Sequence, residues 1–101
     1  MKAYLVGFSS RDTKDLSWTE IYMSTAPDIL KKYGGKVLLI GKPEKIISGN
    51  DWERLTIIEF SSMKKLKSFH QDLQYYKVKQ LRIENTIGEM YFFNANDIGD
   101  L

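Results

Sequence analysis

The feature that most constrains the fold of this chain is a set of strand-like segments that are apolar on both faces. They are residues 3–8, 36–40, 55–60 and 89–93. Alternate residues of a strand point to opposite sides of a sheet. In the third segment Leu55 and Ile57 therefore share one face, and Ile58 and Phe60 share the other. A sheet built from these strands needs cover on both sides.

Only two helical stretches are available to provide that cover. The first repeats apolar residues at three- and four-residue steps, at Trp18, Tyr22, Ala26, Ile29 and Tyr33. The second carries Met63, Leu66 and Phe69, followed by Tyr75, Val78 and Leu81. Helices on one face leave the other as a wet apolar patch, which soluble monomers rarely tolerate. We therefore expect a second copy of the chain to cover the open face.

Capping residues predict where the first helix begins and ends. Its candidate N-caps are Ser10, Asp12 and Thr13. Pro27 lies inside the pattern, which predicts a kink or a restart near residues 24–26. Gly34 and Gly35 are expected to end the helix, because glycine readily takes the left-handed conformation of a C-cap.

The second helical stretch is expected to begin at Ser61 or Ser62, with Asp72 as the N-cap of a second piece. Residues 45–47 are a candidate continuation of the second strand. Gly88 precedes the fourth strand, and residues 94–101 form a polar tail. The resulting order is β-α-β-β-α-β, the ferredoxin-like split unit of an α+β protein with a four-stranded antiparallel sheet. With 101 residues, we expect one domain over 1–101, and the apolar second face favours the dimeric α+β barrel variant.

Composition narrows the possible functions. The net charge of +2 gives little reason to expect nucleic acid as a partner. The chain has no cysteine, which excludes disulfides, thiolate nucleophiles and cysteine-ligated metals. No apolar run is long enough to span a bilayer, and the N-terminal one is too short for a signal peptide. We expect a soluble, cytoplasmic protein without a membrane partner.

The lone histidine, His70, is the first candidate for proton transfer near neutral pH. No second histidine and no acidic cluster at ligand spacing accompanies it, so we expect neither a metal ion nor another cofactor. The structural alternative is that His70 ends a helix, where the helix dipole favours its charged form.

The second catalytic candidate is Glu59, which lies mid-strand between apolar neighbours. A carboxylate there is costly to bury unless it is paired or borders a cavity. One interpretation is a pocket acid or base with a raised pKa. The other is a buried ion pair that fixes a helix to the sheet, with Arg82 or a residue across the dimer as the partner.

Five further residues are candidates for ligand binding. Tyr75, Lys79 and Arg82 follow i, i+4, i+7 spacing, so one helix face presents a phenol and two cations. That face suits a carboxylate or phosphate ligand. The alternative is an amphipathic rim whose cations stay in water. Trp18 and Tyr22 line either a ligand cavity or the core.

Three stretches together resemble the bacterial family called domain of unknown function 1330, a member of the dimeric α+β barrel superfamily. They are residues 32–36 (KYGGK), residues 52–62 (WERLTIIEFSS), and Tyr75 followed by residues 79–82 (KQLR). The resemblance spans nearly the whole chain and implies the fold and a homodimer. It implies no established reaction. Relatives on this fold include cofactor-independent oxygenases, haem-degrading enzymes and small-molecule isomerases.

Two functions are therefore expected. The first is binding of a small molecule in a pocket between sheet and helices. The alternative is a cofactor-independent enzyme of oxygenase or isomerase type, acting on a small, partly aromatic substrate, with His70 or Glu59 moving a proton. A water-accessible cavity that holds either residue beside Tyr75 or Arg82 favours the enzyme. A filled interior favours a binding or structural role.

Overall fold

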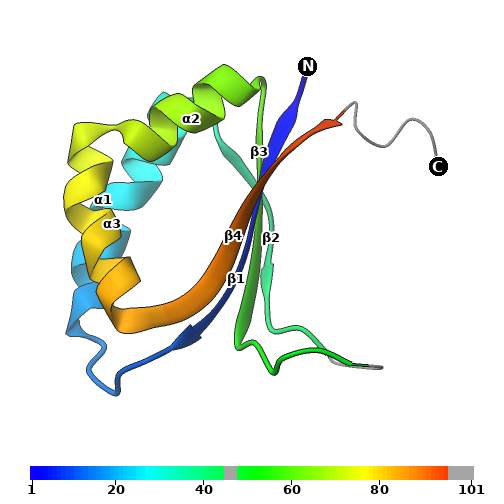
Figure 1. Ribbon diagram of the computed structural model, residues 1–101. Coiled ribbons are helices and arrows are strands. Elements are labelled where there is room, and N and C mark those ends of the chain that lie inside the picture. Colours follow the sequence, from blue (N-terminus) through cyan, green and yellow to red (C-terminus); the bar gives the residue numbers. More distant parts are fainter. Residues whose placement is uncertain (45–47, 96–101) are drawn as a thin grey trace.

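The protein is a four-stranded antiparallel sheet with a layer of helices on one face (Figure 1). The computed structural model describes residues 1–44 and 48–95, so the expected strand at 45–47 and the end of the tail lie outside it. The elements in chain order are β1 (Ala3–Arg11), α1 (Ser17–Lys32), β2 (Lys36–Gly41), β3 (Arg54–Phe60), α2 (Met63–Gln71), α3 (Leu73–Asn85) and β4 (Thr86–Asn94). The strands lie in the order β2-β3-β1-β4. The predicted ferredoxin-like α+β fold is confirmed, with its second helix divided in two.

The core lies beneath α2, where large side chains from the sheet meet the helix. Phe60 of β3 and Leu66 of α2 are fully buried. Phe69 stacks on Phe60 with ring centroids 5.6 Å apart and on Tyr75 at 4.3 Å. Such aromatic pairs add to the hydrophobic stabilisation that burial itself provides. Beneath α2, side chains therefore fill the space between the helices and the sheet.

The opposite face of the sheet carries no helix (Figure 1). Pairing places Val6 of β1 beside Ile57 of β3 and Tyr91 of β4 on that face. Tyr91 and Phe93 are each 47% exposed. The prediction of an apolar sheet with one uncovered face is confirmed.

Side-chain caps mark most of the helix ends as expected. Ser62 accepts a hydrogen bond from the backbone N–H of Lys65 at the start of α2. Asp72 ends α2 and caps α3, which explains why the second helical stretch is two helices. At the end of α1 Gly34 takes a positive φ of 73°. All three agree with the capping preferences of these residues.

The start of α1 differs from the prediction. None of the candidates Ser10, Asp12 and Thr13 caps it, because β1 continues to Arg11 and the helix begins only at Ser17. The first helical N–H is instead bonded by Asp15, whose Oδ1 accepts from the Ser17 backbone N–H at 2.9 Å. The pairing of β1 with β4 takes Ser10 and Arg11 into the sheet.

Pro27 and Gly88 also behave differently from the prediction. The predicted restart of α1 is wrong, because the helix is continuous through Pro27. Pro27 and Met23, whose carbonyl lacks an amide partner, are both exposed, so water can replace the missing donor. Gly88 lies inside β4 rather than before it. A Cβ there would collide with the carbonyl oxygen of Phe8, so only glycine fits.

Candidate functional site

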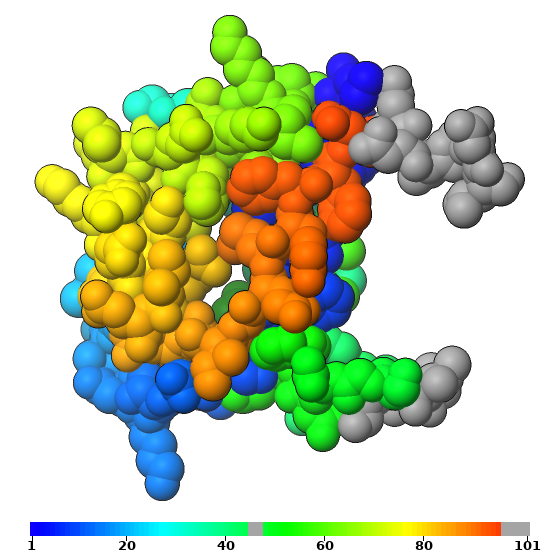
Figure 2. Space-filling view, viewed as in Figure 1, coloured from blue at the N-terminus to red at the C-terminus, as the bar shows by residue number. Residues whose placement is uncertain are grey.

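Away from α2 the helices and the sheet enclose a space that we call the interior hollow. The helix-facing positions of the sheet become small there, with Gly7 paired to Thr56. A Cβ added to Gly7 would meet nothing nearer than the Glu89 carbonyl oxygen at 3.8 Å. The space-filling view shows an opening between α3 and β4 at this level (Figure 2). The sheet is therefore not packed against α1 and α3 as tightly as against α2.

Ring contacts join four of the predicted site residues on the helix side of the hollow. The ring centroids of Trp18 and Tyr22 on α1 are 6.2 Å apart. The ring of Tyr22 lies 6.3 Å from that of Tyr75 on α3, and Tyr75 lies 6.4 Å from His70 on α2. The guanidinium of Arg82 is near enough to act electrostatically on both Tyr22 and His70. Five residues proposed from the sequence thus lie together.

The two tyrosines form a hydroxyl pair. Their oxygens are 3.1 Å apart, so one hydroxyl donates to the other. The pKa of Tyr22 is raised, first by burial and then by Tyr75, while the cations Arg82 and Arg54 oppose the rise. The phenol of Tyr22 is therefore neutral at physiological pH. The hydroxyl that accepts this bond keeps its own hydrogen, which can be donated to another group.

His70 is half-buried, and its ring packs edge-on against Phe92 at 5.4 Å. Burial lowers its pKa, and the positive charges of Lys79 and Arg82 lower it further. The imidazole is therefore neutral at neutral pH and able to accept a proton. The helix-dipole alternative required a charged histidine, which this environment disfavours.

Two N–H donors on this side of the molecule are buried without a partner. They are the indole Nε1 of Trp18 and the Nε of Arg82. An unsatisfied buried donor costs about 1–3 kcal/mol, so such groups in a native structure require an explanation. No side-chain carboxylate among residues 1–44 and 48–95 forms an ion pair with Arg82.

Glu59 lies apart from this group, whereas Lys79 borders it with its ammonium group bonded to the backbone. Glu59 is on the open face of the sheet, where its Oε1 is 3.3 Å from the Nζ of Lys2. It pairs with neither Arg82 nor a helix, and the Lys2 side chain is exposed, so the predicted buried ion pair between a helix and the sheet is wrong. The Nζ of Lys79 donates to the carbonyl oxygen of His70 at 3.1 Å and so closes the end of α2. That ammonium group therefore has a structural hydrogen bond.

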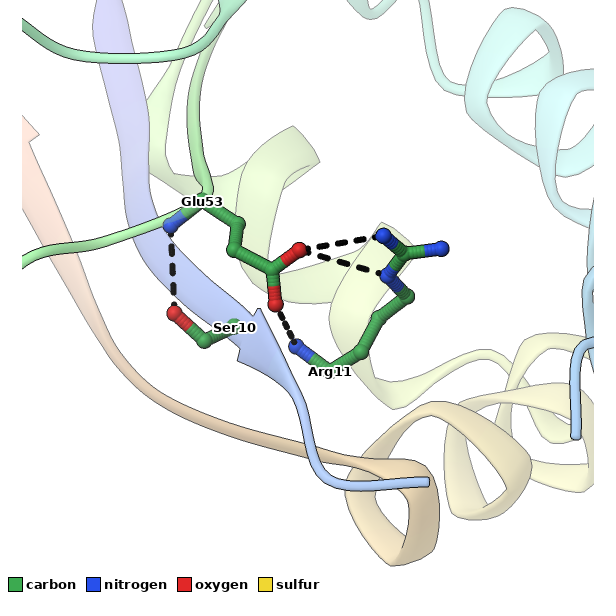
Figure 3. Close-up of polar contacts among 3 residues, drawn as sticks. All are labelled: Ser10, Arg11 and Glu53. Carbon is green, nitrogen blue, oxygen red and sulfur yellow. Dashed lines mark hydrogen bonds and ion pairs between the residues drawn. The ribbon is translucent and has the colours of Figure 1, made fainter. Parts of the chain in front are cut away.

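An ion pair at the end of β1 was not predicted from the sequence. Glu53 Oε1 accepts from the backbone N–H of Arg11 at 2.9 Å, and its Oε2 accepts from the Arg11 guanidinium at 3.1 and 3.3 Å. Figure 3 shows the pair on the helix side of the sheet, with Ser10 accepting from the Glu53 backbone N–H. The pKa of Glu53 is lowered, mainly by the backbone N–H of Arg11. The pair borders an open pocket of 570 Å³ lined by Arg11, Asp12, Thr13, Lys14, Leu16 and Glu53.

Gly7 and Arg54 were also not identified as site residues from the sequence, although the strand pattern around each of them indicated its position. A glycine inside a strand pattern marks a missing side chain or a close approach. Strand alternation already put Arg54 on the face opposite Glu59, which is the helix side. The Arg11–Glu53 pair left no such signal, because it joins residues 42 positions apart through strand register.

The described residues offer no site for a metal ion. No group of three or more histidine, cysteine, aspartate or glutamate side chains is placed to hold one in residues 1–44 and 48–95. In the same part of the chain, no helix is both long and apolar enough to cross a bilayer.

Comparison with known families decides the classification. The family model described as domain of unknown function (DUF1330) matches residues 2–96. The chain belongs to this family. Membership in DUF1330 agrees with the resemblance carried by the motifs around Trp52 and Tyr75. No curated protein matches the sequence.

Solved structures share the fold of this DUF1330 protein at low sequence identity. A protein of unknown function from Rhodopseudomonas palustris is 15% identical, with a TM-score of 0.76 over 91% of this chain and 80% of its own. SnoaB, a cofactor-independent oxygenase from Streptomyces nogalater, is 8% identical, with a TM-score of 0.66 over 93% and 92%. A dabb family protein with a ferredoxin-like fold from Mesorhizobium loti is 11% identical, with a TM-score of 0.61 over 92% and 95%. These similarities establish the fold alone.

Proposed function

We propose that this protein binds a small, partly aromatic molecule in the interior hollow, and that it does so as a homodimer. The observation that carries the proposal is the unfilled space above Gly7, bordered by aromatic and polar side chains of three helices. Ligand sites are typically concave and mostly apolar, with a few convergent polar groups. Trp18, Tyr22 and Arg82 supply that combination.

The homodimer follows from the apolar face that the helices do not cover. Stable interfaces bury roughly 1,200–2,000 Å² in total, and the outer face of a four-stranded sheet is an extended surface of suitable chemistry. Its large apolar side chains include Tyr4, Val6, Phe8, Leu39, Leu55, Ile57, Tyr91 and Phe93. A second copy offers the same chemistry in a closed, symmetric arrangement. We also propose a cytoplasmic location, with which a cysteine-free chain is compatible.

Filling the hollow is expected to abolish binding while the fold survives. Gly7→Leu directs a side chain into the empty space and adds an apolar residue to a strand. The probe is 2-naphthol, a neutral aromatic compound, observed by saturation-transfer NMR on the purified protein. We expect saturation transfer with the wild type and a loss of about tenfold or more in the variant.

The matched control is Gly41→Leu, because a Cβ at Gly41 meets no atom within 4 Å and the residue lies on the edge strand β2. It should bind 2-naphthol as the wild type does, and both variants should keep the wild-type melting temperature within a few degrees. Equal binding by Gly7→Leu, or none by the wild type, would contradict the proposed site.

A second function, cofactor-independent catalysis, is favoured by the position of His70. Its neutral imidazole lies against Tyr75 at the hollow, where it could remove a proton from a bound phenol or enol. The chain also shares its fold with SnoaB, a cofactor-independent oxygenase. The proposal depends on the histidine being uncharged at working pH.

The proposal that His70 acts as a base can be tested without a substrate, because the pKa of its imidazole affects stability. Because the pKa is lowered in the folded protein, acid favours the unfolded chain. Stability should therefore fall as the pH drops below the unfolded value of about 6.5. Chemical denaturation at pH 7.5 and pH 5 should show a larger loss for the wild type than for His70→Gln. NMR titration of this lone histidine checks the pKa directly, and a value above about 6.5 would remove it as a base.

A further inference from the structure

We infer that the ligand of the interior hollow is an organic carboxylate, held by Arg82 and Arg54 with its apolar part against the surrounding rings. The inference rests on the proposed binding function and names the chemical class of the ligand. It comes from the charges and hydrogen-bond donors that the fold leaves without partners.

The charge of two arginine side chains at the hollow is not offset by the ion pairs of the fold. Arg82 of α3 and Arg54 of β3 approach the hollow from opposite layers, and both act electrostatically on Tyr22. Neither arginine takes part in the ion pairs Lys2–Glu59, Arg11–Glu53 and Lys32–Asp72. The carboxylate of Glu53, which lies on the helix side of the sheet, is already held by Arg11. The partly buried Arg82 and the exposed Arg54 thus both bring positive charge to this space.

The polar groups around the hollow are predominantly hydrogen-bond donors. The indole N–H of Trp18 and the Nε–H of Arg82 are buried and unpaired. One hydroxyl hydrogen of the Tyr22–Tyr75 pair is left over. A carboxylate has two acceptor oxygens and about four lone-pair sites, and it matches the planar fork of arginine. A neutral amide or alcohol supplies fewer acceptors and no charge.

Aromatic rings border the hollow and can contact the apolar part of the ligand. His70, Phe92 and Tyr75 present ring surfaces beside the cations. Trp18 and Tyr22 add two more. An aromatic acid places its ring against these side chains and its carboxylate at the guanidinium groups. A free inorganic anion would leave the apolar surface uncovered.

The test compares acids with their uncharged primary amides on the full-length protein. Isothermal titration with benzoate and benzamide, and with 2-naphthoate and 2-naphthamide, holds ring size constant and replaces the carboxylate by a neutral group with fewer acceptors. Because charge-assisted hydrogen bonds are about twice as strong as neutral ones, the acid should bind about tenfold or more tightly. In ¹⁵N-labelled protein, the acid should shift the indole N–H signal of Trp18. That of Trp52, which packs on Phe8 of the open face, should not move.

Matched variants test which positive charge causes the preference for the acid. Arg82→Met keeps an unbranched apolar stem and removes the guanidinium, and it should erase the preference for the acid over the amide. Lys77→Met removes an exposed cation from the same helix and should leave the preference intact. Circular dichroism checks that each variant folds. If Arg82→Met does not fold, Arg54→Met serves the same purpose.

The outcomes separate this inference from the proposed function. Equal affinity for acid and amide overturns the carboxylate inference and leaves the binding function standing, as does a preference for the acid that survives both arginine substitutions. If 2-naphthol and all four titrants fail to bind at millimolar concentration, both proposals fall together. A preference for the acid that is lost in Arg82→Met but kept in Lys77→Met supports the carboxylate ligand.

Discussion

Asp72→Ala is expected to lower the free energy of unfolding by about 2–4 kcal/mol, which for a chain of this size corresponds to a fall in melting temperature of more than about 10 °C. The residue lies where α2 ends and α3 begins, and its side chain is only 7% exposed. Its Oδ1 accepts from the backbone N–H groups of Gln74 and Tyr75, at 2.8 and 3.1 Å. Its Oδ2 accepts from the hydroxyl of Tyr33 at 2.6 Å. One carboxylate therefore joins all three helices.

The pH dependence of this effect has a definite sign. The hydrogen bond from Tyr33 contributes most to lowering the pKa of Asp72, and the N–H groups of α3 and the charge of Lys32 act in the same direction. A lowered pKa means that the stabilisation is complete above the unfolded value of about 3.9 and is lost as the pH falls through the folded value. Urea denaturation should therefore show a large gap between wild type and variant at pH 7. That gap should narrow below about pH 4.

Two further substitutions provide comparisons for the stability loss expected of Asp72→Ala. Tyr33→Phe removes one hydrogen bond but keeps the ring that packs on Phe69, so it should cost only about 1 kcal/mol. Asp12→Ala changes an exposed aspartate that caps no helix and should be nearly neutral. If Asp72→Ala were no more costly than Asp12→Ala, the carboxylate would not be what holds the helices together.

Features with a local cause were predictable from sequence. Ser62, Asp72 and Gly34 act on backbone groups within three residues, so their effect on helix ends could be anticipated. Strand alternation identified the two apolar faces, because the side-chain period of a strand does not depend on the rest of the fold. The α+β order followed from these elements.

Features that depend on register or on three-dimensional charge were not predictable in the same way. The late start of α1 follows from pairing of β1 with β4, which holds Arg11 in the sheet beside Thr86. The partner of Glu59 is Lys2, because both project to the open face near the start of β1. Helical spacing placed Tyr75, Lys79 and Arg82 on one face. It could not show that the ammonium of Lys79 turns to the end of α2.

The homodimer predicts the largest effect on assembly, at the centre of the open face. Val6 lies on an inner strand with Ile57 and Tyr91 as its cross-strand neighbours. In a symmetric dimer Val6→Lys acts twice. Each protomer loses roughly 1.5–3 kcal/mol of side-chain burial and gains a charge in an apolar interface, so the dissociation constant should rise about 100-fold or more. Sedimentation equilibrium at micromolar concentration should find the wild type dimeric and the variant monomeric.

The control for this experiment is Ile21→Lys, which places the same charge on α1 at a side chain that is 54% exposed and faces away from the open sheet. It should leave the dimer intact. The variant at Val6 should still fold, because in the single chain this side chain is only half-buried and a lysine can extend its ammonium into water. Its melting temperature should no longer depend on protein concentration, whereas that of the wild type should rise with it. A wild type that is monomeric under these conditions would mean that the apolar face has some other partner. The interior hollow would then have to be tested as a site complete within one chain.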